Sequence, residues 1–123
     1  MSGGAPFAPG VHILLDLHGA VMLRDARRME AVLRGAAKAA GATVLSCHLH
    51  GFGEGSGITG VALLAESHIS IHTWPERDYA AVDIFMCGKA DARAAAEYLE
   101  KVLQPQRVAR TEVLRGQEVA GAV

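Results

Sequence analysis

The stretch SHISIHTWPERDYAAVDIFMC, residues 67–87, decides the fold of this chain. Polar and apolar residues alternate through 67–74, which is typical of a strand that buries one face, and a further strand is expected to return through 79–87. The four residues between them, 75–78, are Pro, Glu, Arg and Asp, a composition typical of a tight turn. The stretch is therefore predicted to form a β-hairpin of two antiparallel strands, 67–74 and 79–87.

The rest of the chain surrounds this hairpin with helices and further strands. Strands are predicted from period-two alternation or short apolar runs, and helices from apolar stripes at helical spacing. The predicted strands are 11–17, 43–50, 58–66 and 106–114, and the predicted helices are 23–40 and 91–103. This order is typical of an α+β fold. We expect a two-layer sandwich in which a mainly antiparallel sheet carries two helices on one face.

Two details of the prediction concern buried faces, and one concerns a loop. Leu45, Cys47 and Leu49 are expected to share one face of their strand. The strand 58–66 is nearly all apolar and is expected to be buried on both faces. Residues 51–57 contain four glycines, which predicts a loop whose backbone approaches another group closely.

Length, charge and cysteine content are typical of an ordinary cytoplasmic domain. The 123 residues predict one domain at 11–115, with a flexible lead-in at 1–10 and a frayed tail at 116–123. Lys and Arg total 12 against 13 Asp and Glu, a balance that argues against binding to nucleic acid or a membrane surface. No apolar run is long enough to span a bilayer, and the first ten residues do not resemble a signal peptide. Two cysteines make no disulfide framework, so a cytoplasmic location is expected.

Four histidines lie in two close pairs along the predicted strands. His48 and His50 share a face, and their spacing suits two ligands of one metal ion. His68 and His72 also share a face, but four residues along a strand separate them by roughly 12 Å or more, too far for one ion. A zinc site is one reading of these histidines, and ordinary strand histidines without a ligand are the commoner one.

A second group of reactive side chains lies on the hairpin. Counted back from the turn, Ser67 lies within one residue of Cys87. A hydroxyl, a thiol and the imidazole of His68 or His72 are then expected in one neighbourhood, which suits nucleophilic chemistry. No Gly-x-Ser-x-Gly elbow and no orienting aspartate support a hydrolase triad. The residues alone therefore indicate either a nucleophile on a hairpin or ordinary strand residues.

Two runs, AESHISIHTWPE at 65–76 and YAAVDIFMCG at 79–88, closely resemble the prokaryotic S-adenosylmethionine decarboxylase proenzymes. Weaker similarity extends over residues 10–115. The family consists of pyruvoyl-dependent decarboxylases that make their own cofactor by cutting the chain between a glutamate and a serine. The resemblance implies a cut between Glu66 and Ser67.

The same resemblance implies how the cofactor forms. The hydroxyl of Ser67 attacks the carbonyl of Glu66, and elimination then cuts the chain into a β chain, 1–66, and an α chain, 67–123. Hydrolysis leaves a pyruvoyl group made from Ser67 at the new N-terminus. Its carbonyl condenses with the substrate amine and accepts the electrons released by decarboxylation, which no ordinary side chain does.

The resemblance also implies roles for individual residues. His72 is the proton acceptor in processing, a role that suits histidine because the ordinary pKa of an imidazole lies near neutral pH. Thr59, in GITG where the family usually has GVSG, is the processing hydroxyl. Cys87 is the proton donor in catalysis. Glu76 binds the ribose hydroxyls, and Phe52 stacks on the adenine.

The expected activity is decarboxylation of S-adenosyl-L-methionine to the aminopropyl donor for spermidine biosynthesis. Two alternatives remain open: a pyruvoyl-dependent L-ornithine or L-arginine decarboxylase of the same family, and a metal-binding or ligand-binding α+β module that never cleaves. The decarboxylase needs no metal at His48 and His50. Because the family's sheets pair across a dimer, we expect two αβ pairs in each particle.

Overall fold

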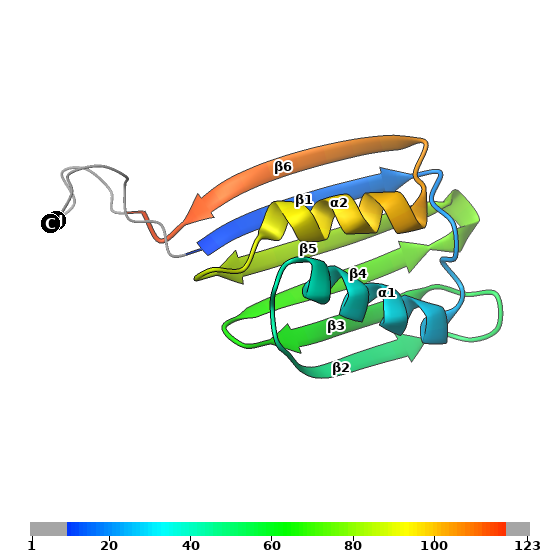
Figure 1. Cartoon of the computed structure of the whole chain (residues 1–123). Helices are drawn as coiled ribbons and strands as arrows, with labels where there is room; N and C mark the ends of the chain where they lie inside the picture. Colours follow the sequence, from blue (N-terminus) through cyan, green and yellow to red (C-terminus); the bar gives the residue numbers. More distant parts are fainter. Residues whose placement is uncertain (1–9, 118–123) are drawn as a thin grey trace, which may run out of the picture.

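The computed structural model describes residues 10–117, which form one sheet with both helices packed on the same face (Figure 1). The sheet has six strands in the order β2-β3-β4-β5-β1-β6, and every neighbouring pair is antiparallel. The predicted α+β sandwich is confirmed. In chain order the elements are β1 (Gly10–His18), α1 (Ala26–Ala39), β2 (Val44–Gly51), β3 (Ile58–Leu64), β4 (Ser67–Trp74), a short 3₁₀ turn (Pro75–Arg77), β5 (Tyr79–Cys87), α2 (Ala92–Leu103) and β6 (Arg107–Arg115).

Both helices begin after an aspartate that caps the free N–H groups of the first turn. Oδ1 of Asp25 accepts a hydrogen bond from the N–H of Arg28 at 3.0 Å, and Oδ1 of Asp91 accepts one from the N–H of Ala94 at 3.1 Å. Caps of this kind contribute about 1 kcal/mol each. The first helix was expected from residue 23, but it begins after the Asp25 cap, so the prediction is too long at this end.

The hydrophobic core lies between the helices and the sheet. Small residues let the two helices approach each other, and a Cβ at Gly35 would lie 2.1 Å from the hydroxyl oxygen of Tyr98. The largest fully buried side chains are Ile13, Leu15, Leu17, Met29, Leu33, Ile58, Ile69, Ile71, Ile84, Met86, Leu99 and Leu103. Burying each such side chain contributes roughly 1.5–3 kcal/mol, so this face holds the fold together.

Two expectations about buried faces are wrong. β3 alternates between buried and more exposed residues, and Leu63 is 45% exposed, because the helices cover only one face of the sheet. The ladder between β2 and β3 shifts register near the start of β2. This bulge turns Leu45 outward, where it is 67% exposed, while Cys47 and Leu49 pack against the core.

The ends of the domain differ slightly from the prediction. Gly10 begins β1 and is buried, so the first strand starts one residue before the expected boundary. Residues 1–9 of the expected lead-in and 118–123 of the expected tail lie outside the described residues. The edge strand β6 is joined to α2 by ion pairs of Arg93 with Glu112 and of Arg110 with Glu100.

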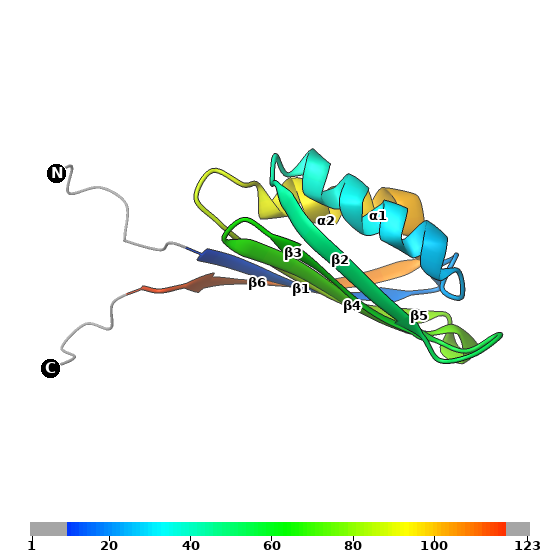
Figure 2. The same cartoon turned by 90° about the horizontal axis from the view of Figure 1, so that it is seen from below.

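Figure 2 shows that, within residues 10–117, no helix covers the other side of the sheet. We call this side the uncovered face, and the strand register places on it all six histidines of the chain. Several apolar side chains there are well exposed, including Leu14 at 38%, Leu63 at 45% and Trp74 at 40%. An apolar surface of this kind is typical of one that another protein covers. The uncovered face consists of His12, Leu14, Asp16, His18, Ser46, His48, His50, Thr59, Val61, Leu63, His68, Ser70, His72, Trp74, Tyr79, Ala81, Asp83, Phe85, Arg107, Ala109, Thr111 and Val113.

Candidate active site

The peptide bond between Glu66 and Ser67 lies in the tight turn that joins β3 to β4. β3 ends at Leu64, so this turn contains two residues that the sequence placed in the strand. Glu66 has a φ of 63°, in the left-handed region that residues with a Cβ rarely adopt. This backbone conformation costs roughly 1 kcal/mol or more, and it persists only where the surrounding structure holds it. The backbone is therefore strained next to the bond that the resemblance marks for cleavage.

Cys87, at the end of β5, holds both sides of this bond. Its Sγ donates a hydrogen bond to the carbonyl oxygen of Glu66 at 2.5 Å. Its backbone N–H donates to Oγ of Ser67 at 3.3 Å, and the Sγ and Oγ atoms are 3.9 Å apart. The expected neighbourhood of Ser67 and Cys87 is confirmed, because β4 and β5 pair in the register that the hairpin predicts. A nucleophilic hydroxyl, the carbonyl that it would attack and a proton donor are together here.

The second cysteine is a different kind of thiol. Cys47 packs against the core from β2. Burial, reinforced by the nearby carboxylate of Glu30, raises the pKa of the Cys47 thiol. Cys47 therefore stays protonated and is unsuited to nucleophilic chemistry.

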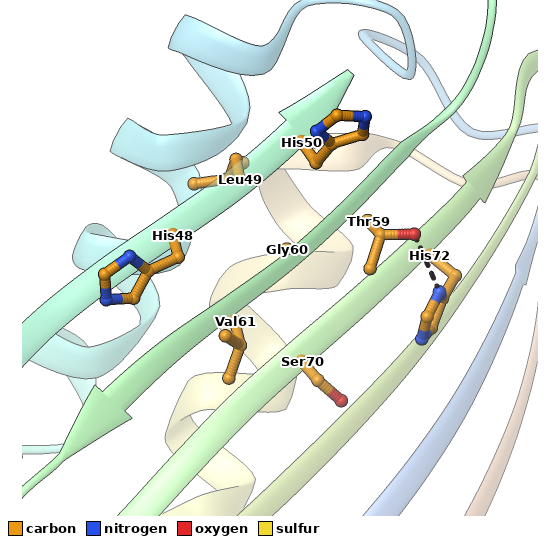
Figure 3. A pocket seen from close by; sticks show the side chains of 8 residues that line it. All are labelled: His48, Leu49, His50, Thr59, Gly60, Val61, Ser70 and His72. Carbon is orange, nitrogen blue, oxygen red and sulfur yellow. Dashed lines mark hydrogen bonds between the residues drawn. The ribbon is translucent and has the colours of Figure 1, made fainter. Parts of the chain in front are cut away.

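Thr59 and His72 form a second cluster, near the other end of the hairpin. They lie opposite each other in the ladder of β3 and β4, and Oγ1 of Thr59 is 3.2 Å from Nδ1 of His72 (Figure 3). Both line a pocket of about 440 Å³ on the uncovered face, together with His48 and His50.

A neighbouring pocket of about 280 Å³ adds two further residues of the sequence prediction. It brings Phe52 of the glycine loop next to Glu76 of the hairpin turn, and it also contains Thr59, His72 and Trp74. An aromatic ring, a carboxylate and an indole around one cavity suit a ligand that combines a flat base with hydroxyl groups. Four of the residues implied by the resemblance thus lie around one cavity.

Of the two imidazoles expected near Ser67, that of His72 lies elsewhere within a single chain. His72 does not share the neighbourhood of Ser67, because five residues along β4 separate them by about 16 Å. Their side chains also point to opposite faces of the sheet, Ser67 toward the helices and His72 away from them. His68 is adjacent to Ser67 but packs its ring on Phe85, with centroids 5.9 Å apart. The two clusters therefore form two separate half-sites.

The sequence analysis missed an aromatic row beside the second cluster. Trp74 stacks on Tyr79, with ring centroids 5.2 Å apart. The Tyr79 hydroxyl donates to Oδ1 of Asp16 at 2.5 Å, and this hydrogen bond, with some burial and the charge of Asp16, raises the pKa of Tyr79 to about 12. Tyr79 therefore stays a neutral donor at physiological pH and fixes the ring on which Trp74 rests. The pairing of Trp74 with Tyr79 across the turn was the signal for this contact.

The described residues, 10–117, provide neither a cluster of metal ligands nor a helix that could span a membrane. In the stretch 10–117, no three His, Cys, Asp or Glu side chains lie close enough together to hold a metal ion. His48 and His50 instead line the open pocket of Figure 3. Neither helix in that stretch is long and apolar enough to cross a membrane.

Comparison with known proteins connects this geometry to a family. The sequence model described as S-adenosylmethionine decarboxylase matches residues 11–116. This chain belongs to the S-adenosylmethionine decarboxylase family. The resemblance seen in the hairpin sequence is thus confirmed over nearly the whole described region.

Individual members of the family are similar over most of their length. The S-adenosylmethionine decarboxylase proenzyme of Persephonella marina is 48% identical over 113 residues, which cover 87% of this chain and 82% of that protein. The proenzyme of Methanococcus maripaludis is 44% identical over 110 residues, covering 87% of this chain and 89% of the relative. The crystal structure of the adenosylmethionine decarboxylase from Aquifex aeolicus superposes with a TM-score of 0.82 at 38% identity, covering 94% of this chain and 98% of that one.

Proposed function

We propose that this chain is a proenzyme that cuts itself between Glu66 and Ser67 and then decarboxylates S-adenosyl-L-methionine. The product is the aminopropyl donor for spermidine biosynthesis, and the reaction takes place in the cytoplasm. The observation that carries the proposal is the contact of Cys87 with both the Glu66 carbonyl and the Ser67 hydroxyl. The names of the relatives support the choice of substrate.

Self-cleavage begins with attack by Oγ of Ser67 on the carbonyl carbon of Glu66. The negative charge that develops on the carbonyl oxygen is stabilised by the thiol of Cys87, which already donates to that oxygen. Collapse breaks the C–N bond and leaves an ester between the two residues, with a free amine on residue 67. The left-handed backbone of Glu66 favours this step, since leaving the strained peptide relieves part of its cost.

The ester then eliminates. A base removes the α-proton of residue 67, the ester C–O bond breaks, and the β chain leaves with a free carboxylate on Glu66. The dehydroalanine that remains takes up water and releases ammonia, which makes the pyruvoyl group. The base cannot be His72 of the same chain, because five residues along β4 separate it from Ser67 by about 16 Å.

We therefore propose that the working particle is a dimer of αβ pairs joined through their uncovered faces. The exposed apolar side chains of this face are then buried, and the Glu66–Ser67 end of one chain meets the Thr59–His72 end of its partner. Each active site is shared between two copies of the chain. The partner's His72 then removes the α-proton, with its Nδ1 held by the hydroxyl of Thr59.

The surroundings of position 67 suit a pyruvoyl group. Ser67 is nearly buried, and its Oγ is held by the backbone N–H of Cys87 rather than by bulk water. A pyruvoyl group at this position supplies the electron sink for the charge left when carbon dioxide departs. Cys87 delivers the proton that the α-carbon of the product needs. Glu76 orients the ribose hydroxyls, and Phe52 stacks on the adenine.

The decisive experiment combines mass and activity. Intact-mass measurement of the purified protein should show the chains 1–66 and 67–123, the second blocked at its N-terminus. Carbon dioxide release is then measured with S-adenosylmethionine, L-ornithine and L-arginine. Turnover of S-adenosylmethionine is expected, whereas turnover confined to either amino acid would overturn the substrate, and an uncut chain would overturn the whole proposal.

Cys87→Ala should separate cofactor formation from catalysis. The variant still contains Ser67 and is expected to cleave, more slowly because the carbonyl of Glu66 loses its thiol donor. Turnover of each cleaved chain should fall by roughly 10² or more, the usual scale for a lost general acid. The assay is carbon dioxide release for each α chain, with Cys47→Ala as the matched thiol control. Wild-type turnover in a fully cleaved Cys87→Ala protein would remove this residue from the mechanism.

A further inference from the structure

Thr73 lies on β4 between the site residue His72 and the pocket residue Trp74, and its hydroxyl group is buried. The residue is only 6% exposed. Its Oγ1 accepts a hydrogen bond from the N–H of Ile58 at 2.9 Å and donates one to the carbonyl oxygen of Leu23 at 2.8 Å. One hydroxyl thus satisfies two backbone groups that are 35 residues apart along the chain.

The first of these bonds holds the start of β3, where Thr59 lies. The backbone ladder between β3 and β4 begins at the pair of Thr59 and His72. The N–H of the preceding residue, Ile58, bonds to the side chain of Thr73 instead. Gly57 packs directly on the same residue, since a Cβ at this glycine would lie 2.2 Å from the carbonyl oxygen of Thr73. The end of the glycine loop is therefore fixed against Thr73.

The connection between β1 and α1 holds the same loop from the other side. The carbonyl oxygen of Leu23 accepts the hydrogen bond from the Thr73 hydroxyl. The next residue, Arg24, donates a hydrogen bond from Nε to the carbonyl oxygen of Gly55 at 3.1 Å. Phe52, at the beginning of the loop, is joined to its end by a hydrogen bond from its N–H to the carbonyl oxygen of Gly57. The position of Phe52 relative to Glu76 thus depends on two anchors, the hydrogen bonds that Thr73 and Arg24 make to the start of β3, at Ile58, and to the loop, at Gly55.

We propose that Thr73 is a positioning residue that holds Thr59 against His72 and holds the glycine loop at the substrate pocket. This inference rests on the proposed function. Thr73 touches neither of the reacting groups, and it acts on processing through the Thr59–His72 pair. Thr73 also lines the pocket of about 280 Å³, but its hydroxyl bonds to two backbone groups and acts on substrate binding through the loop that carries Phe52.

This placement predicts a specific division of effects. The chemistry of a cleaved and loaded site uses position 67 and the Cys87 thiol, and the Thr73 hydroxyl bonds only to backbone groups of Ile58 and Leu23, so this chemistry does not depend on that hydroxyl. Losing the hydroxyl should slow self-cleavage and raise KM for S-adenosylmethionine, each by about tenfold, the effect of one or two lost hydrogen bonds. The value of kcat for each cleaved chain should change less than threefold. A purely structural role would lower the fraction of folded protein without this division.

The test compares Thr73→Val, which keeps the shape and removes the hydroxyl, with Thr73→Ser, which keeps it. Thr73→Val should show slow cleavage and a raised KM, and Thr73→Ser should restore both. Ile71→Val, a buried neighbour on the same strand, is the matched control for lost packing and should cleave at the wild-type rate. Wild-type cleavage and KM in Thr73→Val, or slow cleavage in Ile71→Val as well, would overturn the inference.

Arg24→Gln keeps the test decisive if Thr73→Val does not fold. Arg24 is exposed, and its side chain holds the glycine loop through the hydrogen bond to the carbonyl oxygen of Gly55. This variant should therefore raise KM by a few-fold and leave the cleavage rate unchanged. An unchanged KM in Arg24→Gln would overturn the role of the loop anchors. Failure of the proposed function itself is distinguishable, because the wild-type chain would then remain uncut.

Discussion

Ser67→Ala is expected to remain a single uncut chain with no decarboxylase activity, however long it is incubated. The methyl group of alanine cannot attack the Glu66 carbonyl, and Ser67 is the residue whose hydroxyl is held beside Cys87, the donor to that carbonyl. Oγ of Thr59 belongs to the other half-site, where it bonds to His72. Because self-cleavage and the pyruvoyl group both start from this one oxygen, the loss should be complete rather than partial.

Intact mass after a long incubation checks the first half of this prediction, and carbon dioxide release checks the second. Ser56→Ala is a matched control, since it removes an exposed serine hydroxyl from the glycine loop, outside the Glu66–Ser67 turn and outside the uncovered face. It should cleave as the wild type does. Any chain ending at residue 66 in the Ser67→Ala protein would show that another group performs the attack.

The second large effect concerns two chains that are each inactive alone. Ser67→Ala lacks the nucleophile, and His72→Ala lacks the proposed base, whose loss should slow processing by roughly 10²–10⁴. When the two are produced together, half of the dimers should be mixed. In each mixed dimer one site combines Ser67 of one chain with His72 of the other. About a quarter of the wild-type number of sites should therefore be active.

The identity of the cleaved chain makes this experiment decisive. With different tags on the two chains, mass spectrometry should find that the His72→Ala chain is cut and the Ser67→Ala chain is not. Producing His72→Ala together with the double variant Ser67→Ala/His72→Ala should leave every chain uncut. If His72 acted on Ser67 of its own chain, the mixed dimers would also remain uncut, and the shared site would be wrong.

The hairpin could be predicted from the sequence because residues 67–74 alternate and residues 75–78 have the composition of a tight turn. Residues 67–74 and 79–87 form β4 and β5 as expected, so the approach of Ser67 to Cys87 followed from counting across the turn. The bulge that exposes Leu45 was not predictable in this way, because it depends on how β2 pairs with β3. The burial of β3 was overestimated for a related reason, since apolar residues do not reveal whether the second face of a sheet is covered within the chain.

The candidate site was predicted less completely than the fold. The resemblance located the residues, and local counting brought Ser67 next to Cys87. Counting alone did not separate His72 from them, because the expectation considered distance along the chain and not the face to which each side chain points. The role of Thr73 depends on contacts with Leu23 and Ile58, 50 and 15 residues away, which no local pattern contains.

Trp74 gives this protein a built-in optical probe. It is the single tryptophan of the chain, it is 40% exposed, and it lines the same cavity as Phe52 and Glu76. Light absorbed selectively by indole therefore reports from the proposed substrate pocket and from nowhere else in the chain. A purine that enters this cavity would lie near the indole and change its emission, so binding can be followed without label, even in the uncut Ser67→Ala protein.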